Sequence, residues 1–589
     1  MKVTDYVAQF FVRIGIRQAF VVSGGASLHL IHSVEKTKGI TYICCHHEQA
    51  AAMSADGYYR VTGTPGLAIS SSGPGATNLI TGITGCYYDS IPTFFITGQV
   101  STFRMALDKM VRQVGFQETP IVEMTRPVTK YAVQIKDPNQ IKYELQKAYF
   151  LAINGRPGPV LIDIPDDIQR MEIDKSYMPE FVNDVDNVAN TQELDDICDT
   201  IVSRISCSSR PVLIAGWGVY LAGCKNQFVT LVNKLNIPVA LTWGASDLLP
   251  ANHPLRIGTF GTHGTRFSNF AVQNADFILS IGSRLDTKAT GSPPKTFARE
   301  AWRAVNDISL AELKKFADYG LTIDCLVHAD ASNFISSLIP RVEPSNCLPW
   351  KARIKDWKNK YSVIKEERFQ GKFVDPYNLF DLLCDYVPEE VNLFSDTGST
   401  IAWLMQAYRP KESHRVWHDF NNTAMGWALP ASIAGALADP SRATYCIVGD
   451  GSLMMNIQEL QTAVSYGINI KIICLNNNGY SMIQQTQDQW LDGNYIASSP
   501  DGGVRIPDLC QVCKAFGVQV SRASSNKDLP EKLSWLLESN ASSFLLVDID
   551  SRCRVTPQVK FGRPNEDPEP LLERNLFMKE MIVQTIDNS

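Results

Sequence analysis

The sequence has no excess of positive charge and no long hydrophobic run, and both absences exclude broad classes of function. Its 589 residues carry a formal net charge of −6 with a pI near 5.9, so it has no basic field to attract nucleic acid or anionic lipid. No apolar run approaches the roughly 18 residues of a membrane span. The N-terminus has an amphipathic helical period, unlike a secretory signal. We expect a cytoplasmic protein that binds neither nucleic acid nor membrane.

The sequence also lacks a cysteine framework, although it contains 14 cysteines. Their scatter through a long chain indicates reduced, mostly buried thiols. The one C-x-x-C pair, Cys510 and Cys513, has no second pair at zinc-ribbon spacing, so we interpret it as two packing residues on a helix. The densest group of possible metal ligands is YICCHHE at 42–48. It begins as a strand, in which side chains alternate in direction, so its neighbours cannot converge on one zinc ion.

What the sequence does contain is a repeated alternation of apolar runs with helical segments. Many of these runs, such as GLAISSSGPG, ATYCIVGDG and IKIICLNNN, end in Gly, Ser, Asn or Asp. Buried parallel strands followed by glycine-rich turns and helices have this pattern, which predicts an α/β fold of doubly wound parallel sheets. Polar stretches around 170–192 and 340–375 interrupt the alternation. They predict three domains and a proline-rich tail, over 1–180, 190–345, 360–555 and 556–589.

The most specific chemical signal lies in the third of these domains. Gly449-Asp450-Gly451 ends one apolar run and Asn477 ends the next. At two adjacent strand ends, a carboxylate and an amide oxygen would lie side by side, and both suit Mg²⁺. The glycines let the backbone approach a phosphate, and Ser452 opens a helix whose free N–H groups favour an anion. The pattern predicts a magnesium ion that bridges the protein to a diphosphate.

This segment resembles the thiamin diphosphate signature, and phrases along nearly the whole chain are similar to acetohydroxyacid (acetolactate) synthases and related carboligases. They include HEQAAAMSADGYYR, SSGPGATN, GFQETP, GRPGPVLIDIP, GSRLD, AMGWALPASIAGALA and GDGSLMMNIQELQTAV. The resemblance implies an aminopyrimidine-binding first domain, a central domain and a diphosphate-binding third domain. It implies a homodimer or homotetramer with active sites between subunits. It also assigns Mg²⁺ to Asp450, Asn477 and the carbonyl oxygen of Gly479.

The resemblance makes Glu48 the principal catalytic residue. We expect Glu48 at a strand end, where its helix begins. The implied role is a hydrogen bond to the aminopyrimidine that promotes its reactive tautomer, and an apolar interfacial pocket would favour the proton exchange. Met425 matches the large apolar residue that supports the bent cofactor, and the backbone of Thr423 and Met425 would hold the pyrimidine edge. The hydroxyls of Ser399 and Thr400 suit the diphosphate.

The central domain resembles the FAD-binding segments of the same synthases, in which the flavin has no net redox role. Lys288 departs from the family, where arginine is usual. Pairs such as Gly216 and Gly218 are weak signals alone, because tight turns also contain them. The residues implied for FAD are Arg156, Gly216, Gly218, Gly261, His263, Gly282, Arg284, Asp286, Asp307, Ile308 and Asp330.

The implied reaction is decarboxylation of a 2-oxo acid, with pyruvate expected, and transfer of the two-carbon unit to an acceptor carbonyl. Gly25 would offer a backbone N–H to an oxyanion and Gln117 would contact substrate, the alternatives being a plain turn and a surface amide. Thr486 stands where the synthases have a tryptophan that helps select the acceptor. The segment STFRMALDKMVRQV, before GFQETP, is also longer than expected.

Both departures concern the acceptor side of the site. A small hydroxyl in place of an indole opens volume and adds hydrogen-bonding capacity. We therefore expect either a larger, more polar ketone, such as a nucleotide-linked keto sugar, or pyruvate itself, which would give acetolactate. A pyruvate oxidase-type flavin enzyme or a simple 2-oxo acid decarboxylase is the alternative. A non-enzymatic homologue is disfavoured, because Glu48, Asp450 and Asn477 are all present.

Overall fold

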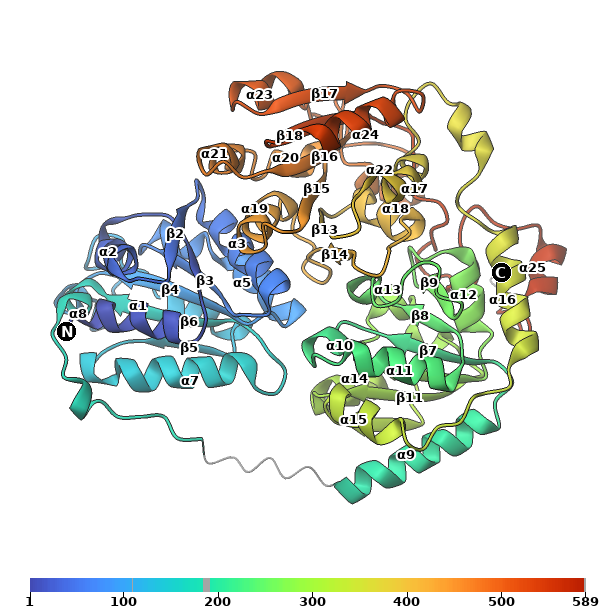
Figure 1. Cartoon of the computed structure of the whole chain (residues 1–589), viewed down its shortest axis with the longest axis horizontal. Coiled ribbons are helices and arrows are strands. Elements are labelled where there is room, and N and C mark those ends of the chain that lie inside the picture. The colour runs from blue at the N-terminus through green and yellow to red at the C-terminus, as the bar shows by residue number, and fades with distance from the viewer. Residues whose placement is uncertain (109, 184–190, 587–589) are drawn as a thin grey trace.

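Three six-stranded sheets form the protein (Figure 1). The computed structural model describes residues 1–108, 110–183 and 191–586. Every pairing between neighbouring strands in the three sheets is parallel, and helices cover both faces. The prediction of three doubly wound parallel α/β sheets is confirmed. No helix in these ranges is long and apolar enough to cross a membrane.

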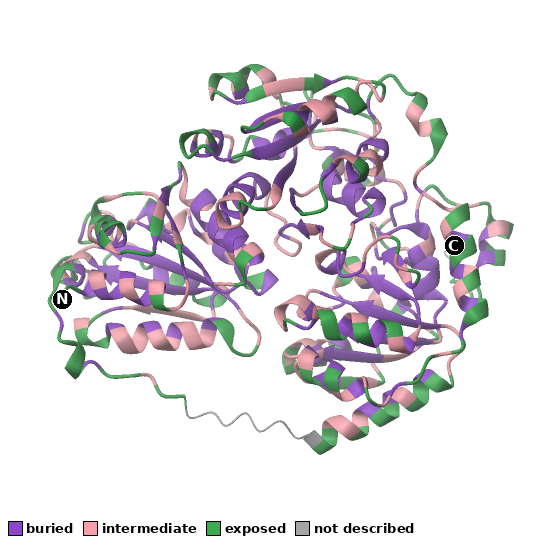
Figure 2. Ribbon diagram, in the orientation of Figure 1, coloured by how far each residue is buried: buried purple, intermediate pink, exposed green. Residues whose placement is uncertain are grey.

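The first sheet has the order β2-β1-β3-β4-β6-β5. Its strands β3 and β4 are buried at every residue, because helices cover both faces (Figure 2). The strands are β1 Gln18–Val21, β2 Thr41–Cys44, β3 Gly66–Ser70, β4 Thr93–Gln99, β5 Tyr131–Gln134 and β6 Val160–Pro165. The main helices are α1 Val3–Arg13, α2 Leu28–Lys36, α3 Glu48–Thr62, α5 Ile80–Asp89, α6 Ile121–Thr125, α7 Ile141–Ile153 and α8 Asp166–Arg170.

The third sheet repeats the topology of the first, with the order β14-β13-β15-β16-β18-β17. In both sheets the order reverses between the first and third strands in sequence, and ligands of open α/β sheets bind outside the carboxyl ends at such a point. The strands are β13 Val391–Ser395, β14 Arg415–Trp417, β15 Ala443–Gly449, β16 Ile470–Asn476, β17 Gln519–Ala523 and β18 Ser543–Asp548. The main helices are α17 Pro376–Tyr386, α18 Ser399–Ala407, α19 Ala428–Ala438, α20 Asp450–Leu453, α21 Glu459–Ser465, α22 Ser481–Trp490, α23 Leu509–Ala515 and α24 Leu529–Glu538.

The central sheet has a different order, β12-β11-β10-β7-β8-β9. Its switch point therefore lies between β7 and β10. The strands are β7 Pro211–Ala215, β8 Val239–Leu241, β9 Arg256–Thr259, β10 Phe277–Ile281, β11 Trp302–Asp307 and β12 Cys325–His328. The main helices are α9 Thr191–Ser206, α10 Gly218–Leu221, α11 Lys225–Leu235, α12 Arg266–Gln273, α13 Thr287–Thr290, α14 Leu310–Asp318 and α15 Ala331–Leu338.

The polar stretch 340–375 contains a helix, α16 Leu348–Lys360, which packs onto the central domain. Its Trp350, Ile354 and Trp357 are buried in that domain's core. The tail crosses the same domain and ends in α25 Arg574–Glu580, whose Glu580 accepts a hydrogen bond from Trp357 Nε1 at 2.7 Å. The other polar stretch, 170–192, includes residues 184–190, which lie outside the described residues.

The first and third domains of one chain meet along α3 and α19 (Figure 1). A Cβ added to Gly57 would lie 2.6 Å from Ala431 Cα, so the two helix backbones approach as closely as glycine allows. Ser54 Oγ donates to Pro430 O at 3.0 Å. This contact fixes the position of α3, and with it Glu48, against the third domain.

Candidate active site

Glu48 begins α3 and follows β2 after only three residues. His47 caps this helix, because its Nδ1 accepts a hydrogen bond from Gln49 N at 3.0 Å. Asn78 Nδ2 donates to Glu48 Oε2 at 2.9 Å, and a Cβ added to Gly75 would lie 3.5 Å from Glu48 Oε1. Within the described residues Oε1 has no hydrogen-bond donor. The carboxylate is thus held by one oxygen, and the other is available to a ligand.

Gln117 and Gly25 lie at the same edge of the first sheet. The backbone of Gln117 has a φ of 66°, a left-handed conformation that costs a non-glycine residue about 1 kcal/mol. A Cβ on Gly73 would lie 2.9 Å from Gln117 Cβ, so the turn after β3 packs directly against it. Ala26 N donates to Ser71 Oγ at 3.3 Å, which joins the turn after β1 to the turn after β3. A Cβ on Gly25 would meet no atom within 4 Å, so this turn opens into free space.

Asp450 and Asn477 follow the neighbouring strands β15 and β16. The carboxylate of Asp450 accepts hydrogen bonds from Gly451 N at 2.7 Å and Gly479 N at 3.3 Å. Burial raises the pKa of the Asp450 carboxyl to about 6, although these N–H groups oppose the shift. Its side chain forms no ion pair with any described residue. A buried carboxylate without a cationic partner is a position that a bound cation would stabilise.

The atoms around Asp450 fit a magnesium ion and a diphosphate. Asn477 Nδ2 and Ser399 Oγ are buried and have no hydrogen-bond partner. Because buried polar atoms are normally paired, these two point to a missing ligand. A carboxylate, an amide and a backbone carbonyl are the oxygen donors that Mg²⁺ takes. Ser399 begins α18, and Thr400 Oγ1 lies near Gly449, where an added Cβ would be 3.4 Å away. Hydroxyl and N–H donors there suit phosphate oxygens.

Asp396 joins two turns of the third-domain part of the site, and no sequence motif singled it out. It follows β13 and is buried. Its carboxylate accepts hydrogen bonds from Thr397 N at 3.0 Å, Gly426 N at 3.1 Å and Ala428 N at 3.0 Å. The turn that contains Met425 is therefore tied to the end of β13. Thr423, with a φ of 54°, and Gly426, with a φ of 85°, are the two left-handed residues of this turn.

Glu48 and Asp450 lie at the ends of strands in two different sheets. The first domain meets its own third domain through α21, where His46 N donates to Glu459 Oε1 at 3.0 Å and Cys44 N donates to Tyr466 OH at 2.8 Å. Among the described residues no hydrogen bond or ion pair joins Glu48 to the Asp450 turn. The candidate catalytic carboxylate and the candidate metal-binding turn thus lie at two different sheets of the chain, without a direct bond between them.

A cavity of about 380 Å³ lies between the three domains, at the switch point of the central sheet. Nine of the residues implied for FAD line it: Arg156, Gly218, His263, Gly282, Arg284, Asp286, Asp307, Ile308 and Asp330. Gly216 and Gly261 do not line the cavity but allow close backbone packing. A Cβ added to Gly216 would lie 2.3 Å from the carbonyl oxygen of Gly282, and one added to Gly261 would lie 2.2 Å from that of Lys288. Trp217, Trp243 and Phe420 add aromatic lining that the sequence did not single out.

The cavity wall has the charges that a dinucleotide needs. Arg156 NH1 lies 2.7 Å from Glu312 Oε1, and Arg284 Nε lies 3.4 Å from the same oxygen. Burial alone would raise the pKa of Glu312, but the hydrogen bond from Lys315 and the nearby arginines lower it to about 2. Three cations share one carboxylate, which leaves positive charge for a diphosphate. Asp307 ends β11, where a carboxylate suits ribose hydroxyls.

Unpaired atoms in the cavity support the same fit. His263 Nδ1 and Asn306 Oδ1 are buried without a hydrogen-bond partner. Lys288 Nζ lies 5.4 Å from the centre of the Trp243 ring, and burial lowers the pKa of this ammonium group. The residues present therefore fit FAD, which would lie with its diphosphate near Arg156 and Arg284.

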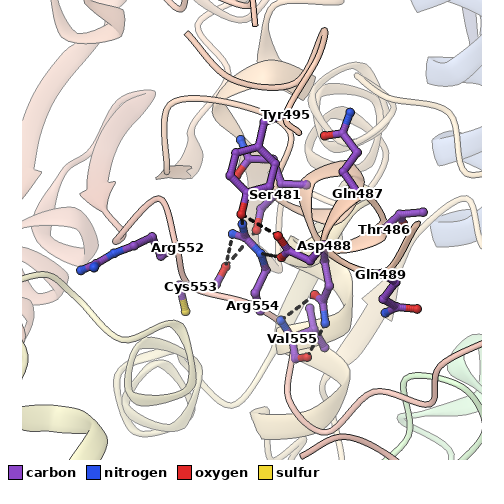
Figure 3. Close-up of polar contacts among 12 residues, drawn as sticks. Ser481, Thr486, Gln487, Asp488, Gln489, Tyr495, Arg552, Cys553, Arg554 and Val555 are labelled. Atoms are coloured by element: carbon purple, nitrogen blue, oxygen red, sulfur yellow. Dashed lines mark hydrogen bonds and ion pairs between the residues drawn. The ribbon is translucent and has the colours of Figure 1, made fainter. Parts of the chain in front are cut away.

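Thr486 lies on α22, close to a network that joins residues 553–555 to this helix (Figure 3). Its Oγ1 donates to Met482 O at 3.1 Å, so the hydroxyl proton serves the helix itself and only the lone pairs remain for a ligand. Arg554 Nε donates to Asp488 Oδ2 at 2.7 Å, and Arg554 NH2 donates to Tyr495 OH at 3.0 Å. These bonds hold α22 through Asp488, which lies on the opposite side of the helix from Thr486.

Comparisons with known proteins identify the family. Three domain models of the thiamine pyrophosphate enzymes match: the N-terminal TPP binding domain at residues 1–123, the central domain at 198–338 and the C-terminal TPP binding domain at 396–549. The chain belongs to the thiamine pyrophosphate (thiamin diphosphate) enzyme family. The resemblance seen in the sequence is confirmed.

Within this family the chain is an acetolactate synthase-like enzyme. It is 31% identical to the acetolactate synthase large subunit of Lactococcus lactis over 564 residues, which cover 96% of this chain and 95% of that protein. It is also 31% identical to the isozyme 1 large subunit of Escherichia coli, with 96% of each chain covered. Identity to acetolactate synthase 3 of Brassica napus is 30%, over 96% of this chain and 86% of that protein.

Proposed function

We propose that the protein decarboxylates pyruvate and transfers the resulting two-carbon acyl unit to a ketone larger than pyruvate, such as a nucleotide-linked keto sugar. The observation that carries this proposal is the open face of α22. Thr486, Ile483 and Trp490 share that face, and Ile483 and Trp490 are 50% and 65% exposed. Thr486 stands where the resembled synthases have a tryptophan. The smaller side chain leaves room for a larger acceptor. Acetolactate formation from two pyruvate molecules is the second candidate, favoured by the names of the relatives.

The chain's own residues have separate tasks in this reaction. Bound thiamin diphosphate supplies the electron sink that makes loss of CO₂ from a 2-oxo acid possible. Glu48 would exchange a proton through Oε1, while Asn78 holds its other oxygen. Asp450, Asn477 and Gly479 would hold Mg²⁺, and Met425 would support the cofactor from the turn that Asp396 fixes. Gln117 and Gly25 border the side on which substrate would enter.

Two copies of the chain would complete the active site. Exposed apolar side chains lie near Thr486: Trp490 shares its face of α22, and the Trp490 ring centre lies 6.3 Å from that of Phe561, which is also exposed. Such side chains favour a subunit contact. A homodimer would bring Glu48 of one copy to Asp450 of the other, and a homotetramer would pair two such dimers.

Mixing two inactive variants tests this arrangement. Glu48→Gln and Asp450→Asn each disable both sites of a homodimer. In a mixed dimer, one interfacial site would retain both native residues, so random mixing should restore about one quarter of wild-type activity. If Glu48 and Asp450 of the same chain formed the site, the mixture would stay inactive.

Product identification tests the reaction itself. The holoenzyme is incubated with pyruvate alone and then with a panel of nucleotide-linked keto sugars, and products are identified by mass spectrometry. A branched sugar that has gained an acetyl group is expected. Rapid acetolactate formation from pyruvate alone would overturn the keto sugar assignment. Appreciable oxygen or quinone consumption would identify a pyruvate oxidase-type reaction instead, and acetaldehyde as the sole product would identify a simple decarboxylase.

The flavin is proposed on the fit of the central cavity. FAD released by denaturing the purified protein, detected by its absorbance and fluorescence, tests this point. Arg284→Gln should weaken FAD binding, because it removes a cation from the wall near the proposed diphosphate position.

A further inference from the structure

Segment 102–116 has little regular secondary structure, yet carboxylates fix both of its ends. After a single turn at Thr102–Arg104, the described residues 105–108 and 110–116 form no helix or strand. At its start, Asp167 accepts hydrogen bonds from Thr102 N at 3.0 Å and from the Thr102 hydroxyl. Ser101, one residue earlier, donates to Asp166. The first end of the segment is therefore bound to α8.

Glu118 fixes the other end and the middle. Its Oε1 accepts from Ala106 N at 2.8 Å, and its Oε2 accepts from Val114 N at 2.8 Å and Gly115 N at 3.2 Å. Partial burial works against ionisation, but these three donors lower the pKa of Glu118. One ionised carboxylate thus joins both arms of the segment. Glu118 adjoins Gln117, so the shape of the segment is linked to the site edge.

The segment exposes cations that have no acidic partner. Arg104 and Arg112 are exposed and form no ion pair with any described residue. Arg104 lies 5.3 Å over the ring of Phe103, which is itself 73% exposed. Asp108 is the segment's one exposed acid, and its Oδ1 accepts from Met110 N at 2.9 Å. The arginines therefore have free donor groups beside an aromatic surface.

Cations that follow β18 have acidic partners, unlike those of the segment. Arg554 contacts Asp488, and Lys560 Nζ lies 3.3 Å from Glu569 Oε1. Arg563 lies 3.8 Å from Asp567. Of these partners, Asp488 lies on α22, the helix that carries Thr486. An anionic acceptor at Thr486 would thus find the guanidinium group of Arg554 already paired.

We propose that segment 102–116 recognises the anionic part of the acceptor, with Arg104 and Arg112 binding the diphosphate of a nucleotide-linked ketone and Glu118 as the positioning residue. The inference rests on the proposed function, because it assigns the binding groups of the same acceptor. Guanidinium groups match phosphate oxygens in a bidentate geometry. Exposed Phe103 and Phe116 add faces on which a base can stack. The fixed ends reduce the ordering cost that a free loop would bring to binding.

The first test measures binding without turnover. The holoenzyme is saturated with thiamin diphosphate, Mg²⁺ and FAD, so that their sites are filled, and is titrated with UDP, CDP, GDP and dTDP by calorimetry. At least one should bind, and Arg104→Gln with Arg112→Gln should raise its Kd by about 100-fold, at about tenfold for each arginine. Arg126→Gln, an exposed arginine of the same domain without an ion pair, is the matched control and should leave the Kd unchanged. An unchanged Kd in the double variant, or no binding by any of the four, would overturn the inference.

The second test separates positioning by Glu118 from a general loss of structure. Glu118→Gln has one accepting oxygen where three N–H donors converge, so we expect faster trypsin cleavage at Arg104 and Arg112. The KM for the keto sugar should rise at least tenfold, with a smaller change in the KM for pyruvate. Glu123→Gln, an exposed acid on α6, is the control. Equal changes in both KM values would refute a positioning role.

The outcomes also distinguish this inference from the proposed function. If the double arginine variant binds nucleoside diphosphates normally but loses its dimeric mass, the segment is a subunit contact and the inference is wrong. If the wild-type protein binds a nucleoside diphosphate through these arginines but transfers no acyl unit to any keto sugar, the proposed reaction fails while the binding site stands.

Discussion

Replacing Asp396 with alanine should separate the turn that contains Met425 from the sheet that carries Asp450. The side chain is 1% exposed and accepts three backbone hydrogen bonds of 3.0–3.1 Å. Each buried N–H left without an acceptor costs about 1–3 kcal/mol, and water entering the new space would recover part of this. We expect the free energy of unfolding to fall by about 3 kcal/mol.

Asp396→Asn refines this expectation. Thr397 N and Gly426 N donate to Oδ1, and Ala428 N donates to Oδ2. Asparagine keeps one accepting oxygen and loses one bond, so the cost should be about 1–2 kcal/mol. Urea unfolding followed by circular dichroism measures both changes. Affinity for thiamin diphosphate with Mg²⁺, followed by tryptophan fluorescence, should fall in the same order.

Asp501→Ala, at an exposed position of the same domain, is the control for the Asp396 series. If Asp396→Ala loses less than about 1 kcal/mol and binds the cofactor as wild type does, the three hydrogen bonds do not hold the turn, and the reasoning is wrong.

Three other perturbations test further parts of the molecule. Glu48→Gln should keep cofactor affinity, because a glutamine oxygen can still accept from Asn78, while turnover falls by about 10²–10⁴-fold; undiminished turnover would remove Glu48 from the mechanism. Asp450→Asn should weaken Mg²⁺ binding at least tenfold, measured as a smaller rise in Tm on adding Mg²⁺ with thiamin diphosphate, and an equal rise would exclude Asp450 as a ligand. Glu312→Gln should destabilise the protein above about pH 5, because the folded pKa of Glu312 lies near 2, below its unfolded value. The difference in unfolding free energy between wild type and Glu312→Gln should shrink as the pH falls from about 4.5 towards 2, and a difference that is constant with pH would contradict the shift.

The sequence was sufficient to place the candidate residues that follow strand ends. Asp450 and Asn477 could be brought together because each directly follows a buried strand, and Glu48 could be placed at the start of α3 for the same reason. Asp396 could not be found this way, because its importance depends on a turn thirty residues later that folds back onto it. Glu118 likewise requires the path of an irregular segment, which no periodicity encodes.

Helix α16 was not predicted, although the sequence does contain a signal for it. The stretch 340–375 is polar overall, and its composition indicated a linker. Trp350, Ile354 and Trp357 nevertheless recur at intervals of four and three residues, which places them on one face of a helix. All three are buried in the central core. Average polarity concealed a narrow apolar stripe that the spacing alone would have revealed.

The first and third sheets share one topology, and each carries part of the candidate active site. In both, the turns after the two strands at which the strand order reverses carry candidate residues or pack against them. In the first sheet, Gly25 follows β1 and Gly73, after β3, packs against Gln117, while Glu48 follows the neighbouring β2. In the third sheet, Ser399 follows β13 and Asp450 follows β15. Because α3 and α19 pack backbone to backbone, the first domain is held against the third domain of the same chain. In the proposed homodimer, a second copy related by a two-fold axis would bring the Glu48 end of one first sheet to the Asp450 end of the other chain's third sheet, and would do so twice.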